Sequence, residues 1–182
     1  GGSGIVVRRY QISSGQSGTA KATGGSISYY GGKTIHTFTS SGTFATSPNW
    51  SAADVEYIVV AGGGGGGTGG NAEGSGGGGA GGFRTGTTPI GAHPVSTSIQ
   101  VGAGGIGGRA GASSNGTPSY FGTPITSAGG GAGAAGTSPS HSAQTGGSGG
   151  GGGHPSPSGA SGNTPPVSPS PQGNAGGDYG AY

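Results

Sequence analysis

The chain has 182 residues, of which 53 are Gly, 12 are Pro and none is Cys. Only 27% of its residues are hydrophobic and 5% are charged, and its formal net charge is +2. This hydrophobic share is too small to fill an ordinary globular core along the whole chain, and the lack of Cys excludes disulfides and thiol chemistry. Because net charge is also low, repulsion does not expand the chain, and we expect backbone hydrogen bonding to provide much of its order.

Neither nucleic acid nor a membrane is an expected partner. The basic residues are dispersed, with Arg8 and Arg9 as the one adjacent pair, whereas phosphate binding needs cations clustered along one face. No apolar run approaches the roughly 20 residues that cross a bilayer. We therefore predict no nucleic-acid binding and no membrane insertion.

Strand-like sequence is concentrated before residue 62. Short runs rich in β-branched and aromatic residues alternate there with Gly and Ser, at residues 5–10, 26–30, 34–39, 43–45 and 55–60. This pattern is typical of an antiparallel β-sandwich or meander. We assign residues 13–61 to the sandwich and treat residues 1–12 as a separate strand, with Trp50 covering the small core.

Residues 62–182 form a glycine-rich region in which brief strand candidates at 82–84, 96–101 and 119–121 separate the tracts. No segment has apolar residues at helical spacing free of Gly and Pro, so no helix is expected. Residues 137–172 are rich in Ser, Thr and Pro, which favours an extended loop or tip.

Three kinds of structure would explain so high a glycine content. Collagen is excluded because Gly does not recur at every third position. A flexible linker is an alternative, but apolar residues such as Ile99 and Phe121 lie between the tracts. The third is polyglycine II, an extended helix with three residues per turn whose amides and carbonyls bond to neighbouring tracts. We predict an all-β fold: a small antiparallel β-sandwich continuing into a layered polyglycine-II-like region, without helices.

The sequence has no catalytic constellation, and we predict no enzyme activity, cofactor or metal. The tract at 62–67 imitates a dinucleotide-binding loop, but neither the following helix nor the required acid is present. Asp54 and Glu56 share one strand face and are expected to be solvated. The four His residues have no close-spaced partner, so metal binding would need a symmetry axis.

Asn49-Trp50-Ser51 and Asn115-Gly116-Thr117 are sequons for N-glycosylation. Asn49 and Asn115 are therefore candidate modification sites, although such triplets arise readily in a chain rich in Ser and Thr.

Several segments together resemble a known domain. Residues 33–44 (Lys-Thr-Ile-His-Thr-Phe-Thr-Ser-Ser-Gly-Thr-Phe) resemble the opening of a glycine-rich domain found in tail fibres of marine bacteriophages, cyanophages included. Similar elements follow in the same order, at 55–64, 79–84, 99–105, 114–116 and 119–122. The resemblance covers residues 33–136 and implies a structural role outside cells.

The ends of the chain look offset relative to that domain. Residues 1–10 resemble its closing strand, whereas 175–182 resemble the stretch before that strand. We therefore expect residues 5–10 to complete a neighbouring unit by strand addition, with Ile5, Val6, Val7 and Tyr10 as subunit contacts.

These observations predict a structural module of an extracellular fibre or a virion appendage that associates with itself. If the module forms the tip of such a fibre, it would recognise a host glycan or protein through loops at 84–95, 109–119 and 137–172. The candidate receptor-facing residues are Tyr120, His141 and His154. The alternatives are a subunit of an extracellular filament linked by strand donation, and a capsid decoration protein.

Overall fold

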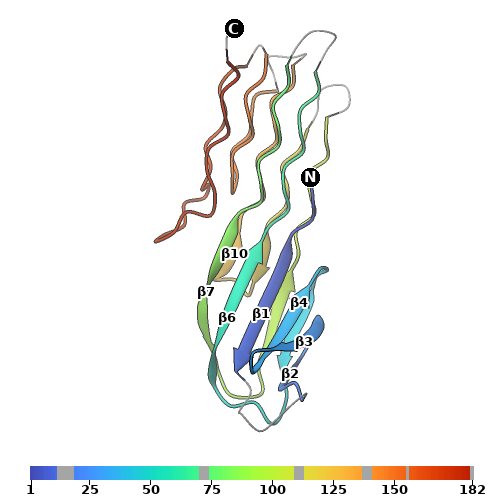
Figure 1. Cartoon of the computed structure of the whole chain (residues 1–182), viewed down its shortest axis with the longest axis vertical. Coiled ribbons are helices and arrows are strands. Elements are labelled where there is room, and N and C mark those ends of the chain that lie inside the picture. Colours follow the sequence, from blue (N-terminus) through green and yellow to red (C-terminus); the bar gives the residue numbers. More distant parts are fainter. Residues whose placement is uncertain (12–18, 70–73, 109–112, 137–140, 155, 181–182) are drawn as a thin grey trace.

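The computed structural model describes residues 1–11, 19–69, 74–108, 113–136, 141–154 and 156–180. The molecule is elongated, with a β-sandwich at one end and a bundle of extended glycine-rich tracts at the other (Figure 1). The described residues contain strands, turns and extended segments but no helix. The predicted all-β fold is therefore confirmed.

One sheet of the sandwich, sheet A, has five antiparallel strands in the order β3-β4-β1-β6-β7. Its strands are β3 (Ser26–Tyr30), β4 (Lys33–Phe38), β1 (Ile5–Gln11), β6 (Ala53–Val60) and β7 (Phe83–Ile90). Burial alternates along β1 and β4, as expected when successive side chains point to opposite faces of a sheet. One face of sheet A therefore covers the core and the other faces outward.

The second sheet, sheet B, has the order β10-β9-β8-β5-β2. Its strands are β10 (Ile125–Ser127), β9 (Ser119–Phe121), β8 (Ser96–Gln100), β5 (Gly42–Thr46) and β2 (Ala22–Thr23). Three of them lie beyond residue 61, as does β7 of sheet A. The sandwich is therefore not confined to residues 13–61, because sequence-distant strands complete both sheets.

Strand β1 corrects the expectation of strand donation. It pairs with β4 from Val6 to Gln11 and with β6 from Ile5 to Arg9. Both of its edges are thus hydrogen-bonded within its own chain, and it is the central strand of sheet A. A strand in this position has no free edge with which to complete another unit.

The hydrophobic core lies between the two sheets and is small. Its most enclosed members include Val6, Phe44, Val55, Val59 and Ile99, each at most 2% exposed. Trp50 closes one end, where its Nε1 donates a hydrogen bond to the Gly91 carbonyl at 3.0 Å. Trp50 is only 5% exposed, which confirms its predicted place as a cover on the core.

Hydrogen bonds in the glycine bundle recur at every third residue. The amides of Gly130, Gly133 and Gly136 donate to the carbonyls of Gly62, Gly65 and Thr68, at 2.9, 3.0 and 2.7 Å. On another side of the tract that contains Gly130 and Gly133, the amides of Gly76, Gly79 and Gly82 donate to the carbonyls of Ala134, Gly131 and Ala128, each at 2.8 Å. A three-residue repeat with bonds between tracts is the signature of polyglycine II. The layered region predicted from sequence is therefore present.

Glycine is required at the inward positions of these tracts. A Cβ atom on Gly62 or Gly65 would overlap the carbonyl of Ala103 or Ile106, and one on Gly64 would overlap Gly131. Because the obstructing atoms are backbone, they cannot move aside as a flexible side chain could. The close approach of neighbouring tracts thus explains the composition of the region.

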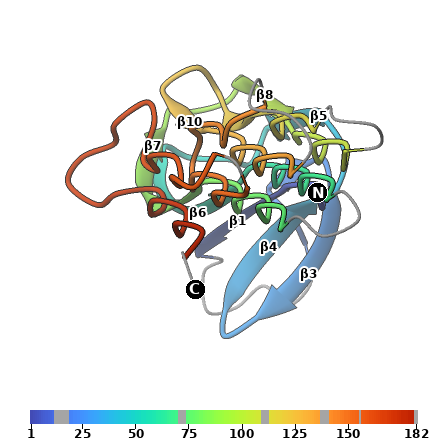
Figure 2. The ribbon, with the colours of Figure 1, turned by 90° about the horizontal axis from the view of Figure 1, so that it is seen from above.

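Residues 129–136 form the centre of the bundle and are buried throughout. Seen along the long axis, the tracts appear as coils arranged in rows over the end of the sandwich (Figure 2). The surrounding tracts that bond to residues 129–136 belong to 62–68, 76–79, 115–116, 141–144 and 147–151. Backbone of these tracts bonds to most of the amides and carbonyls of the segment, and the side chains of Asn115 and Ser113 bond to the Ala132 amide and the Gly133 carbonyl, as buried backbone groups require.

The segment 137–172 differs from the predicted single loop, although 137–140 and 155 lie outside the described residues. Residues 141–153 run within the bundle, and Ala160 bonds to Gly150 and Gly176. Residues 163–171 leave the bundle as a lateral loop (Figures 1 and 2). The Asn163 Oδ1 atom accepts from the amides of Val167 and Gln172, which closes this loop at its base.

Candidate functional site

The most unusual side chain of the sandwich is Arg8, which is fully buried between the sheets. Its guanidinium carbon lies 4.0 Å from the ring centroid of Phe44 and 3.6 Å from that of Phe121. Its Nε, Nη1 and Nη2 atoms have no hydrogen-bond partner in the described structure. Burial lowers the pKa of Arg8 to about 9, because the charged form loses its hydration. The two rings supply a cation–π environment in place of water.

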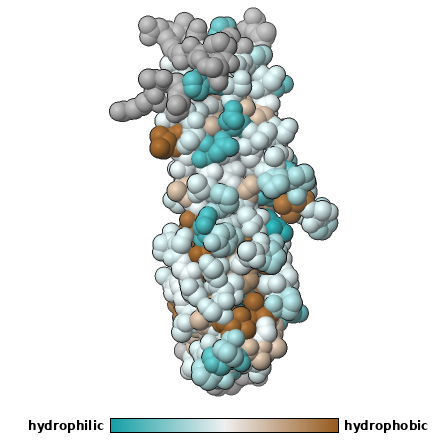
Figure 3. Space-filling model, turned by 180° about the vertical axis from the view of Figure 1, so that it is seen from behind, coloured by the Kyte–Doolittle hydropathy of each residue, from teal (hydrophilic) through white to brown (hydrophobic). Residues whose placement is uncertain are grey.

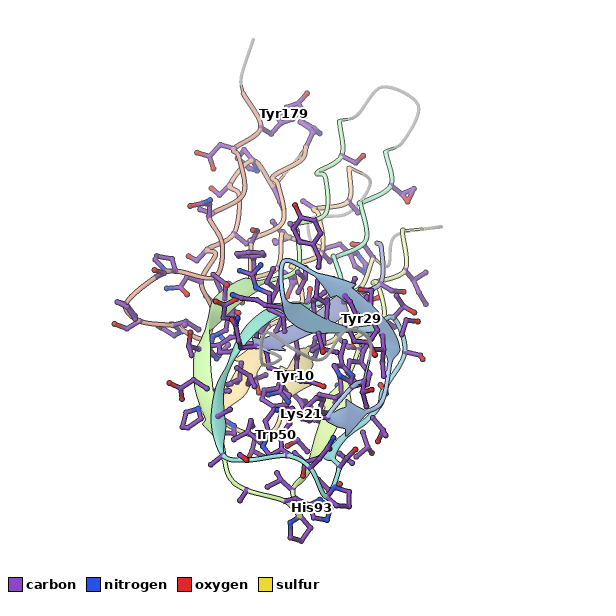
Figure 4. All side chains as sticks on the ribbon, turned by 60° about the horizontal axis from the view of Figure 1, so that its bottom comes forward. Tyr10, Lys21, Tyr29, Trp50, His93 and Tyr179 are labelled. Atoms are coloured by element: carbon purple, nitrogen blue, oxygen red, sulfur yellow. The ribbon has the colours of Figure 1, made fainter. Side chains whose placement is uncertain are left out.

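A hydrogen-bonded aromatic cluster lies beside Arg8. The Nδ1 atom of His36 is 2.7 Å from the Gly24 carbonyl, which fixes the proton on Nδ1. The Tyr10 hydroxyl lies 3.4 Å from the His36 Nε2 and accepts from the Lys21 amide at 2.9 Å. Tyr10 and Trp50 meet edge to face, with centroids 4.8 Å apart, and both point into the sandwich (Figure 4).

Burial shifts two pKa values in this cluster. It lowers the pKa of His36, and the hydrogen bond to Gly24 opposes this only in part. It raises the pKa of Tyr10. His36 is therefore held as neutral imidazole and Tyr10 as neutral phenol, which suits a structural core.

Sequence reasoning did not place Arg8 inside. The signal lay in the alternation of Ile5–Gln11, which puts Val6, Arg8 and Tyr10 on one face of the strand. The alternation alone does not reveal the setting of Arg8, because Phe44 and Phe121 come from strands of the other sheet.

The acidic residues that the structure describes do not converge on a reactive site. Glu56 lies on the exposed face of sheet A, paired with Arg9 and with Lys33, whose Nζ is 2.9 Å from Oε1. These hydrogen bonds, that from Lys33 foremost, lower the pKa of Glu56. Among the described residues, no group of three His, Cys, Asp or Glu side chains could hold a metal. The same residues include no helix long and apolar enough to cross a membrane.

The predicted subunit contacts divide between the two faces of β1. Val6 and Tyr10 are buried in the core, so their side chains cannot reach a neighbouring subunit. Ile5 and Val7 are half-buried on the outward face of sheet A. There, Val7, Ile35 and Ile58 line a shallow groove of about 420 Å³ that also touches Glu56.

A polar notch opens on the side of the bundle over tract 129–136. It has a volume of about 320 Å³ and is lined by Ser113, Asn115, His141, Ser142 and Gln144. Here side chains, and not the backbone of a neighbouring tract, bond to tract 129–136. Asn115 Oδ1 accepts from the Ala132 amide at 2.8 Å, and Ser113 Oγ donates to the Gly133 carbonyl at 2.8 Å. His141 and Asn115 are thus neighbours at one site.

The other candidate receptor-facing residues lie in different surroundings. Tyr120 is half-buried in β9, where it pairs with Gln100 and Thr126. His154 is exposed and faces Tyr179 at the far end of the bundle, with ring centroids 6.3 Å apart. Figure 4 shows Tyr179 at the end opposite His93. The three candidates do not form one site.

The two sequons differ in accessibility. Asn49 is exposed in the turn closed by the Trp50 amide and the Ser47 carbonyl. Asn115 is also exposed, but its Nδ2 donates to the Thr145 carbonyl at 3.2 Å, and its Oδ1 is bonded to Ala132. Attachment of a glycan at Asn115 would compete with these bonds, so Asn49 is the better candidate.

Comparison with protein families places the chain in a known group. A family model described as a glycine-rich domain matches residues 37–182, which is most of the chain. The protein therefore belongs to this glycine-rich domain family. The matched range begins within β4 and includes both sandwich strands and glycine tracts. No curated protein and no solved structure matches the chain.

Proposed function

We propose that this protein is a structural module of an extracellular fibre or a virion appendage, of the kind found in bacteriophage tail fibres. The observation that carries the proposal is the glycine bundle, which extends the sandwich along the long axis of the molecule (Figure 1). Its cohesion comes from backbone hydrogen bonds between tracts. A body of this kind resists bending without needing a large side-chain core.

The surface chemistry suits exposure outside cells. From residue 110 to residue 177 the sequence contains no Asp, Glu, Lys or Arg, so changes of pH and salt have few charges to act on. Buried, bonded backbone is also a poor protease substrate, because cleavage needs local unfolding.

Electron microscopy of the source particle with antibodies against the purified chain tests this role. We expect label along thin projections on a virion or on a cell surface. Label distributed over an icosahedral shell would instead indicate a capsid decoration protein, and label on long cell-surface polymers would indicate a cellular filament subunit. Label confined to the cell interior would contradict the proposal.

A second role, adhesion to a host glycan, is favoured by the polar notch. Its hydroxyl, amide and imidazole groups are the kind that hydrogen-bond sugars, and they converge over one tract. Glycan-array binding that disappears in Gln144→Ala but persists in the matched surface variant Gln100→Ala would support this role. Equal binding by both variants, or none by the parent protein, would count against it.

A further inference from the structure

The outward face of sheet A is apolar at the end that adjoins the glycine bundle. Ile5, Val60 and Phe83 pair side by side on β1, β6 and β7. Two residues away along the strands, Val7 pairs with Ile58. Phe83 is 51% exposed and Ile58 is 39% exposed. An antiparallel sheet with one face in water normally carries polar residues on that face, so this apolar end has the composition of a contact surface.

The opposite side of the molecule differs from this face. It is mostly hydrophilic or intermediate in hydropathy, with apolar residues in separate patches (Figure 3). On sheet A the apolar side chains adjoin one another instead, and three of them, Val7, Ile35 and Ile58, line the groove of about 420 Å³. The outward face of sheet A is therefore the better candidate for an interaction surface.

Charge is divided across the same face, at the end far from the bundle. The acids Asp54 and Glu56 belong to β6, and the cations Arg9 and Lys33 belong to β1 and β4. Glu56 is in register with Arg9, and Lys33 is in register with Gln11. Asp54 and Lys33 are therefore level with each other on either side of β1. Both ion pairs among the described residues involve Glu56, so the exposed Asp54 has no ion-pair partner in the described structure.

This distribution distinguishes the two ways in which a pair of such sheets can stack. Stacked sheets keep their strand directions within about 30° of each other, so the strands of two copies run either in the same direction or in opposite directions. With opposite directions, apolar ends would lie on charged ends, and β6 would lie on β6, acid against acid. With the same direction, about a two-fold axis parallel to β1, apolar ends lie together and β6 lies on β4.

We propose that two copies of this chain pair through the outward faces of their A sheets, with parallel strands and with Asp54 of each copy beside Lys33 of the other. This contact is self-complementary in both hydropathy and charge, as a two-fold axis requires. Arg9, on the central strand, remains neutralised by the acid of its own chain. Phe83 and Ile58 would lose contact with water. Both glycine bundles would then extend from the same end of the pair, which is the arrangement that a fibre of parallel chains needs.

Sedimentation equilibrium of the purified full chain tests the interface. The wild-type protein is expected to dimerise. Ile58→Lys should weaken dimerisation by at least about tenfold, because it places a charge in the apolar part of the contact. Ser98→Lys, at an exposed position on β8 of sheet B, is the matched control and should dimerise like the wild type. Thermal unfolding under dissociating dilution checks that both variants are folded.

Charge reversal tests the orientation of the two copies. Asp54→Lys and Lys33→Asp should each weaken dimerisation by roughly threefold or more, because like charges then face each other twice across the axis. An equimolar mixture of the two variants should dimerise about as tightly as the wild type, since each contact then joins a lysine to an aspartate. Mixing would not restore a dimer whose strands run in opposite directions.

Three results would overturn the proposal: a wild-type protein that stays monomeric up to about 1 mM, an Ile58→Lys variant that dimerises as tightly as the wild type, or no recovery when the charge variants are mixed. The inference rests on the proposed structural role, but the two fail separately. A monomer that labels fibres would retain the role and lose the interface. A parallel dimer confined to the cell interior would retain the interface and lose the role.

Discussion

At the scale of single residues, the core is unusual in having a cation at its centre. A buried guanidinium without hydrogen-bond partners costs several kcal/mol of desolvation, and contacts with two rings recover only part of it. Arg8 connects the sheets, since it belongs to sheet A and both rings belong to sheet B. It therefore contributes to the pairing of the two sheets while lowering the total stability.

Replacing Arg8 with an uncharged side chain of similar length should raise stability. We expect Arg8→Met to increase the free energy of unfolding by about 1–3 kcal/mol, because the penalty of burying a charge disappears while contacts with Phe44 and Phe121 are kept. Denaturant unfolding at pH 7 measures this. Arg8→Ala, which leaves a cavity, should destabilise, and a Met variant less stable than the parent would show that the ring contacts outweigh desolvation.

His36 should make stability depend on pH. The pKa of His36 is lower in the folded protein than in the unfolded chain, where it is about 6.5. At a pH below about 6.5, the unfolded chain therefore binds more protons than the folded protein. Stability is then complete above about pH 6.5 and falls as the pH drops through the folded pKa. Thermal unfolding from pH 8 to pH 5 should show this loss, and His36→Gln should show a smaller one. Equal slopes in both proteins would assign the dependence to other groups.

At the scale of elements, the glycine tracts follow a rule that inward positions exclude side chains and outward positions do not. Composition and the order of motifs were enough to predict a backbone-packed region next to a sandwich. They did not indicate which tracts are neighbours, because glycine carries no side chain to mark its partner. For the same reason the sequence does not show that the strands β7, β8 and β9 belong to the sandwich and not to the glycine-rich region, and it does not indicate β10 as a strand.

A pair of matched substitutions tests the rule. Gly64→Ala should lower the free energy of unfolding by more than about 3 kcal/mol, since its Cβ atom would overlap the Gly131 backbone. Gly77→Ala should leave stability unchanged or raise it by up to about 1 kcal/mol, because Ala restricts the unfolded chain and meets nothing in the folded one. Similar effects of the two substitutions on unfolding would mean that the tracts are not closely packed.

At the scale of the whole molecule, the sandwich and the bundle are continuous. Strand β6 leads into tract 62–68, tract 74–82 leads into β7, and Ser127 Oγ donates to the Val59 carbonyl across the core at 2.9 Å. The predicted strand donation failed at this scale. Residues 1–10 resemble a closing strand in sequence, but β1 pairs with two strands of its own chain, β4 and β6.

The central claim is that ordered backbone hydrogen bonds, rather than side chains, hold the glycine bundle together. Native-state amide hydrogen exchange tests it most directly. The account predicts that amides of Gly130, Gly131 and Gly133 exchange as slowly as those in the central strand β1, while the amide of Gly77 exchanges rapidly. Exchange of the tract 129–136 at the rate of an unstructured chain, with β1 still protected, would contradict it.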